Sequence, residues 1–110
     1  MKTDRELLEL AARAAGIDAY WDEEYQRMQM DYHHKGGTNY EEWNPLNDDG
    51  DALRLAVKLC LEIDVHHTGI AVRTLCGHKI LIDADEVKCG YAATRRAITR
   101  AAAAIGESMK

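Results

Sequence analysis

The most reactive side chains of this chain are its three cysteines and five histidines. The cysteines, Cys60, Cys76 and Cys89, include no Cys-x-x-Cys pair. A cysteine nucleophile needs a neighbouring base, and a structural zinc site needs tightly spaced ligands. We expect Cys60 on a buried helix face and the other two beside turns. Adjacent histidines on a strand point to opposite faces, so His33-His34 and His66-His67 cannot easily share an ion. We predict no catalytic residue, no metal site and no cofactor.

The acidic segment 48–51 could in principle bind calcium. An EF-hand loop needs alternating oxygen ligands, with Gly at its sixth position and Glu at its twelfth. Counting back from Gly50 places Pro45 in the first ligand position, which removes that ligand. The side chains of Asn47, Asp48 or Asp49 can instead accept the free N–H groups of a helix start. The segment therefore predicts a helix cap.

Three arginines, Arg95, Arg96 and Arg100, fall on the first turns of the last predicted helix, with Lys88 just before it. Guanidinium groups beside helix N–H groups can bind a phosphate or a nucleotide. The competing interpretation is a solvated helix face, or salt bridges to the acids of residues 22–51. Both interpretations stay open from the sequence.

Aromatic and histidine side chains gather between residues 18 and 43. Tyrosine offers a large contact area, and histidine adds hydrogen bonding, so this mixture is typical of recognition surfaces. The binding residues predicted here are Tyr32, His33, His34 and Tyr40. The competing interpretation assigns Trp21, Trp43 and Tyr25 to the core, because the chain has no Phe. We expect Trp43 in the core. We expect Tyr32 and Tyr40 to be exposed.

Three helices are predicted around these residues. Thr3 and Glu6 form a capping box, and Gly16 is a natural stop, so the first helix covers Asp4–Ala15. The second covers residues 49–61, and the third covers residues 91–106. The expected buried face of the second helix consists of Leu53, Ala56, Val57 and Cys60, widened by Ala52, Leu55 and Leu59. The expected core stripe of the third consists of Thr94, Ile98, Ala101, Ala102 and Ile105.

Strands are predicted where β-branched residues alternate with polar ones, at residues 62–66, 69–75 and 79–84. Residues 25–32 alternate in part, and the turn chemistry of residues 35–39 predicts a hairpin that returns towards Trp43. Helical structure at residues 22–30 is the alternative. The fold class is therefore α+β: an antiparallel sheet of three to four strands packed with helices in an α-β-α layered sandwich. We expect residues 1–110 to form a single domain.

The net charge of −5 is unevenly distributed. Residues 22–51 hold nine acids against two bases, a net charge of −7, and residues 88–110 have a net charge of +4. An acidic chain is poorly suited to general nucleic-acid binding, which depends on phosphate neutralisation. The asymmetry instead favours self-association or docking to a basic partner surface.

Three stretches resemble the phage ABA sandwich domain family of small phage and prophage proteins. They are Trp-Asn-Pro-Leu and Asp-Asp-Gly-Asp-Ala-Leu-Arg-Leu-Ala-Val-Lys-Leu within residues 43–59, Thr-Asp-Arg-Glu-Leu-Leu-Glu-Leu-Ala-Ala at 3–12, and Tyr-Ala-Ala-Thr-Arg-Arg-Ala-Ile at 91–98. The resemblance leaves residues 18–42 and 62–88 unmatched. It implies an α–β–α layered domain of phage origin, and it supplies no catalytic residues.

These observations predict a non-enzymatic phage accessory protein that acts by binding in the host bacterial cytoplasm. Its most concrete form is an inhibitor of a bacterial anti-phage defence system that contacts a host defence protein or complex. The alternatives are an oligomeric sponge for a nucleotide or phosphate signalling molecule, and a structural or regulatory phage component. No signal peptide or membrane span is expected.

Self-association is predicted from the third helix. Its small residues Ala93, Ala97, Ala101 and Ala104 lie away from the Ile98 and Ile105 stripe. A helix that is apolar on two sides can pack on the sheet with one side and on a partner chain with the other. We therefore expect a homodimer or a larger assembly.

Overall fold

A computed structural model describes residues 2–34, 37–83 and 90–109, with the side chains of residues 31–40 excepted. The first helix, α1 (Asp4–Ala15), has the predicted boundaries. The Thr3 hydroxyl accepts the Glu6 N–H, the Glu6 carboxylate reaches back to the Thr3 N–H, and Gly16 ends the helix at φ 67°. Both sequence signals, the capping box and the glycine stop, are confirmed.

Helix α2 (Asp49–Lys58) begins where the cap predicts and ends earlier than expected. Asp48 Oδ2 accepts the Asp51 N–H at 2.8 Å, so the helix-cap interpretation of the acidic segment is confirmed. Cys60 lies beyond the helix in the left-handed region, at φ 54°. There the N–H of Leu61 donates to the Ala56 carbonyl at 3.0 Å, which closes the helix end.

The predicted buried face of α2 is only partly confirmed, because Ala52, Leu55 and Ala56 are buried and three other expected members are exposed. Leu53 and Val57 are 62% and 69% exposed, and Cys60 is exposed as well. The residues that face the core are Ala52, Leu55 and Ala56. Apolar residues nearly surround this helix, so its periodicity could not choose between two faces, and packing against α3 turned the other one inward.

Helix α3 (Gly90–Ser108) is the centre of the molecule and is packed on two sides. Ile98, Ala101 and Ala102 are buried as predicted. However, the alanine face expected to bind a partner chain is largely covered within the chain: Ala93, Ala97 and Ala101 are 4% exposed or less, and Ala104 is half-buried. That surface is therefore an internal contact, and the argument for self-association through it is wrong.

Six strands form two antiparallel sheets of three strands each. The first contains β1 (Ala19–Asp22), β2 (Arg27–His34) and β3 (Gly37–Glu42), which confirms strand over helix in this region. The second contains β4 (Glu62–His66), β5 (Gly69–Arg73) and β6 (Lys79–Asp83), the three strands that the alternation predicted. β5 ends two residues earlier than expected, and residue 84 lies outside the described residues.

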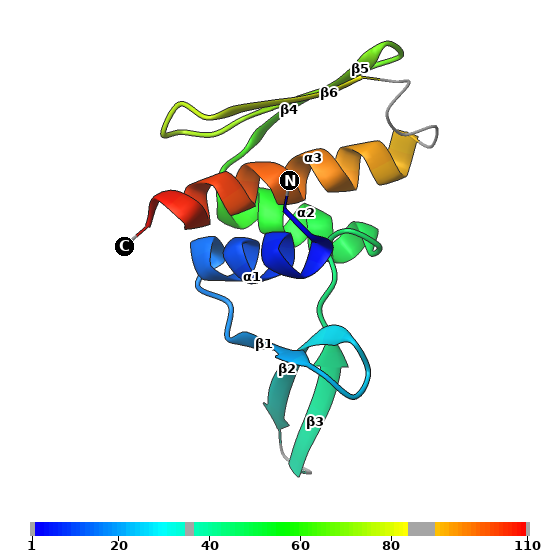
Figure 1. Cartoon of the computed structure of the whole chain (residues 1–110), viewed down its shortest axis with the longest axis vertical. Helices are drawn as coiled ribbons and strands as arrows, with labels where there is room; N and C mark the ends of the chain where they lie inside the picture. Colours follow the sequence, from blue (N-terminus) through cyan, green and yellow to red (C-terminus); the bar gives the residue numbers. More distant parts are fainter. Residues whose placement is uncertain (1, 35–36, 84–89, 110) are drawn as a thin grey trace.

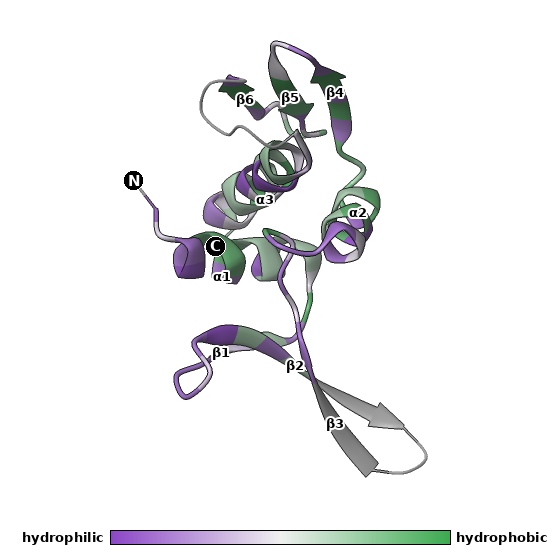
Figure 2. Cartoon of the chain, turned by 90° about the vertical axis from the view of Figure 1, so that its right-hand side faces the viewer, coloured by the Kyte–Doolittle hydropathy of each residue, from purple (hydrophilic) through white to green (hydrophobic). Residues whose placement is uncertain are grey.

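The helices lie between the two sheets, so the α+β class with antiparallel sheets is confirmed (Figure 1). Sheet β4-β5-β6 covers α3, and sheet β1-β2-β3 extends from the other side of the helices as a protruding hairpin (Figures 1 and 2). The long axis of the molecule, 46 Å, runs from one sheet to the other. None of the helices in the described ranges is long and apolar enough to cross a membrane.

Candidate binding site

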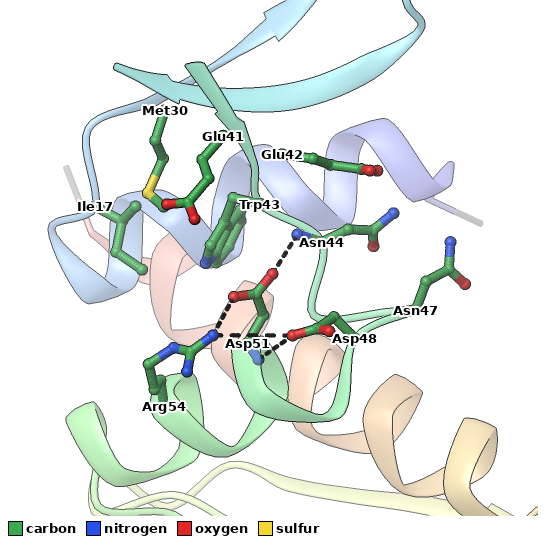
Figure 3. A pocket seen from close by; sticks show the side chains of 10 residues that line it. All are labelled: Ile17, Met30, Glu41, Glu42, Trp43, Asn44, Asn47, Asp48, Asp51 and Arg54. Atoms are coloured by element: carbon green, nitrogen blue, oxygen red, sulfur yellow. Dashed lines mark hydrogen bonds and ion pairs between the residues drawn. The ribbon is translucent and has the colours of Figure 1, made fainter. Parts of the chain in front are cut away.

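A cavity of about 750 Å³ lies where the base of the hairpin meets the start of α2 (Figure 3). Its apolar part is formed by Ile17, Met30 and Trp43. Trp43 is 3% exposed, and its backbone N–H donates to the Met28 carbonyl at 3.0 Å, which joins this residue to the end of the hairpin. The assignment of Trp43 to the core is confirmed, and the same side chain lines the cavity.

The cavity is lined on its polar side by four carboxylates against one guanidinium. These residues are Glu41, Glu42, Asp48, Asp51 and Arg54. Glu41 lies on the same side of the chain as Met30 and Arg54, whereas Glu42 points to the other side (Figure 3). The two glutamates are exposed, so the rim presents negative charge to solvent.

The Asp51 carboxylate connects the loop before α2 to Arg54 on the polar side of the cavity. One carboxylate oxygen accepts the Asn44 N–H at 3.0 Å and the other accepts Arg54 Nη2 at 2.8 Å. The Asp51 hydrogen bond is the main reason that the pKa of Arg54 lies above its ordinary value, and Asp48 and Glu41 add to the effect. Asp51 therefore fixes the loop before α2 against the helix, and it leaves Glu41, Glu42 and Asp48 as the outer charges.

A cavity with an apolar floor and negatively charged residues at its rim is complementary to a positively charged group at the end of an apolar chain. Lysine and arginine side chains have this form, with methylene groups that pack and a charged end that pairs with carboxylates. Within the described ranges, no three His, Cys, Asp or Glu side chains gather closely enough to hold a metal ion. The arrangement therefore fits a basic side chain of a partner better than a bare ion.

The three predicted arginines do not converge on one site. Arg95 donates to the Leu46 carbonyl at 2.9 Å and to Asp49 at 2.6 Å, whereas Arg96 turns to Asp4 at 3.2 Å. Asp49 belongs to the acidic segment, so the salt-bridge interpretation describes Arg95. Arg96 and Arg100 line a second hollow of about 450 Å³.

The four predicted hairpin residues lie on two paired strands. Tyr32 is opposite Asn39, His33 is opposite Thr38, His34 is opposite Gly37 and Tyr40 is opposite Asp31. Their side chains lie outside the described residues, so their binding role stays a prediction.

The other aromatic residues of this region divide between core and surface. Trp21 is partly buried, with the Arg5 guanidinium 5.2 Å from its ring centroid. Tyr25 is 62% exposed, so the competing interpretation that places it in the core does not hold for this residue. It lies at the turn between β1 and β2, where the Arg27 guanidinium is 5.0 Å from its ring centroid.

Sequence reasoning missed Glu41, Glu42, Asp51 and Arg54 as members of one site. It assigned the aspartates of α2 only to the helix cap and did not place the end of β3 beside them. The available signal was the acid excess of residues 22–51, because four of these nine acids line the cavity. Comparison with protein-family models, with curated proteins and with solved structures finds no match for this chain.

Proposed function

We propose that this protein is a non-enzymatic binding protein that docks its acidic cavity onto a basic protein surface. The observation that carries the proposal is the combination of an apolar floor at Trp43 with exposed carboxylates at Glu41, Glu42 and Asp48. Such a rim attracts a basic partner over a distance of about one Debye length and favours one docking orientation.

The protruding hairpin adds contact area next to this cavity. Sheet β1-β2-β3 extends away from the helices (Figure 1), and the cavity lies where its base meets α2 (Figure 3). In this proposal a lysine or arginine of the partner enters the cavity, while the hairpin with Tyr32, His33, His34 and Tyr40 lies along the neighbouring surface. The aromatic and charged residues then have separate roles, in contact area and in orientation.

The most concrete form of the proposal is a phage accessory protein that inhibits a bacterial anti-phage defence system in the host cytoplasm. It is supported by the resemblance of residues 43–59 to the phage ABA sandwich family and by the acidic cavity. Complexes that handle nucleic acids carry basic grooves, and an acidic surface of the right shape can occupy such a groove.

The decisive experiment combines a single charge reversal with a matched control. Glu41→Lys reverses a charge at the cavity, and Glu24→Lys makes the same change in the turn between β1 and β2. We expect the wild type and Glu24→Lys to co-purify with a host defence protein and to raise phage plating on a restricting host. Glu41→Lys should lose both effects. If the wild type recovers no host protein and leaves restriction unchanged, the proposal fails.

The alternative of a nucleotide sponge is favoured by one observation, the second hollow lined by Lys2, Arg96 and Arg100. Acidic groups already occupy part of it, because Asp4 pairs with Arg96 and Glu107 pairs with Lys2. Mass spectrometry of the purified protein and thermal shift with cyclic nucleotides would identify such a ligand. A structural or regulatory phage component would instead give a phenotype in hosts that lack any defence system.

A further inference from the structure

Strand β6 is one edge of the second sheet, and β5 is its only neighbour in the sheet as described. An edge strand presents unpaired N–H and C=O groups that can pair with another strand. β6 reads Lys79-Ile80-Leu81-Ile82-Asp83, with a cation at one end and an anion at the other. This order is self-complementary when two such strands run antiparallel.

The hydrogen-bonding direction of β6 follows from its hairpin. The N–H of Thr74 donates to the His78 carbonyl at 2.9 Å. Bonded and non-bonded residue pairs alternate along an antiparallel ladder, and Val72 opposes Ile80 and Ile70 opposes Ile82. Ile80 and Ile82 therefore direct their backbone groups to β5. Lys79, Leu81 and Asp83 direct theirs to the free edge.

Neither charged residue of β6 forms an ion pair across the described sheet. Lys79 lies opposite Arg73, a like charge, and Asp83 lies opposite Gly69, which has no side chain. The salt bridges of the sheet join Arg73 to Asp64 and Glu62, and in the described chain none includes Lys79 or Asp83. The Leu81 side chain between them is 63% exposed.

We propose that two copies of this chain form a two-fold homodimer by antiparallel pairing of their β6 strands, centred on Leu81. Lys79 of each copy then lies opposite Asp83 of the other, Ile80 lies opposite Ile82, and the two Leu81 side chains meet on the outer face. The three residues with free backbone groups become hydrogen-bonded pairs, and the two sheets join into one sheet of six strands.

The charge order specifies this register and this edge. A shift by one pair on either side sets Lys79 or Asp83 against Leu81, which removes both charge pairs. The opposite edge, β4, lacks the same complementarity, because a two-fold axis at Asp64 places two carboxylates opposite each other. The sequence of β6 therefore favours pairing through this edge strand and in this register.

Two single variants and their mixture test the dimer. Lys79→Glu places acids opposite acids across the axis, and Asp83→Lys places bases opposite bases, so each should weaken dimerisation at least about tenfold. An equimolar mixture of the two variants restores both opposite-charge pairs and should form a heterodimer. Sedimentation over a concentration series measures each association, with a dimer at twice the 12.4 kDa of one chain.

The control is Lys58→Glu, which makes the same charge change on an exposed residue of α2 and should leave the dimer unchanged. Recovery in the mixture also shows that both variants are folded. A wild-type protein that stays monomeric at about 100 μM, a range well above the micromolar scale of ordinary interfaces, would overturn the proposal. So would single variants that dimerise like the wild type, or a mixture that does not associate.

Discussion

Two apolar helix faces in this molecule have opposite fates. The face of α3 that packs on α1 includes the small residues Ala103 and Gly106, and both are buried. The outer face of α2 carries the larger residues Leu53 and Val57, and it is exposed. Small residues allow two helix backbones to approach closely, and close packing then gains many weak contacts. Burial in this chain therefore follows how closely backbones can approach as well as how apolar a side chain is.

Leu55→Ala and Leu53→Ala compare the two faces of α2 directly and should give the largest difference. Leu55 is 1% exposed, so its truncation leaves a cavity and should lower the free energy of unfolding by about 2–5 kcal/mol. Leu53 is exposed, and its truncation should change that free energy by about 0.5 kcal/mol or less. Urea denaturation followed by circular dichroism measures both. Equal losses would mean that the second face is also covered in solution.

Gly106→Ala breaks the close approach of α1 and α3. A Cβ at this position would meet the backbone carbonyl of Leu10, which cannot move without shifting α1. We expect a loss of about 3 kcal/mol, at the upper end of the usual cost of overpacking. Gly90→Ala is the matched control, because a Cβ there meets nothing within 4 Å. A Gly106→Ala protein as stable as Gly90→Ala would contradict the close helix contact.

The contrast between these helices also explains what the sequence could predict. Local signals in α1 were sufficient, because Thr3, Glu6 and Gly16 act within one turn of the chain. The alternating strands β4, β5 and β6 were predictable for the same reason. The choice of buried face was not local: it depended on how α2 packs on the rest of the core, which buries Ala52 and Leu55 and leaves Leu53 exposed.

The candidate site was only partly predictable for a related reason. The cap role of Asp48 is local and was identified. The meeting of Glu41 with Asp51 and Arg54 depends on the path of the chain from the hairpin through Trp43 and Pro45 into α2. That path joins a strand to a helix. The alternation of the strand and the 3.6-residue repeat of the helix each describe one element, so neither predicts how the two elements meet.

The two helix ends give a smaller comparison of the same kind. Both α1 and α2 are followed by a residue in the left-handed region, Gly16 at φ 67° and Cys60 at φ 54°. Glycine adopts this conformation without strain, whereas a residue with a Cβ loses about 1 kcal/mol. Cys60→Gly should therefore stabilise the protein by about 1 kcal/mol, and Gly16→Ala should destabilise it by a similar amount. Thermal unfolding under reducing conditions measures both, and a destabilised Cys60→Gly protein would contradict the assigned conformation.

The smallest expected effect lies on the outer face of the second sheet, at the pair of Arg73 with Asp64. The Arg73 Nη1 lies 2.7 Å from the Asp64 carboxylate, and this hydrogen bond holds the pKa of Asp64 below its ordinary value. A lowered folded-state pKa contributes stability that is present above the unfolded pKa of about 3.9, and that stability is lost as the pH falls through the folded value. Both side chains reach solvent, so the pair contributes little and salt should weaken it further.

Asp64→Asn tests this pair, because it removes the titrating group and keeps the shape of the side chain. The difference in the free energy of unfolding between wild type and Asp64→Asn should be constant from neutral pH down to about pH 5 and should shrink below about pH 4, where the unfolded Asp64 takes up a proton. Arg73→Gln should remove the same pH-dependent part of the free energy of unfolding at low pH. Combining the two substitutions should lower that free energy little further. If the difference grew as the pH fell, the carboxylate would destabilise the folded sheet, and the assigned direction of its pKa would be wrong.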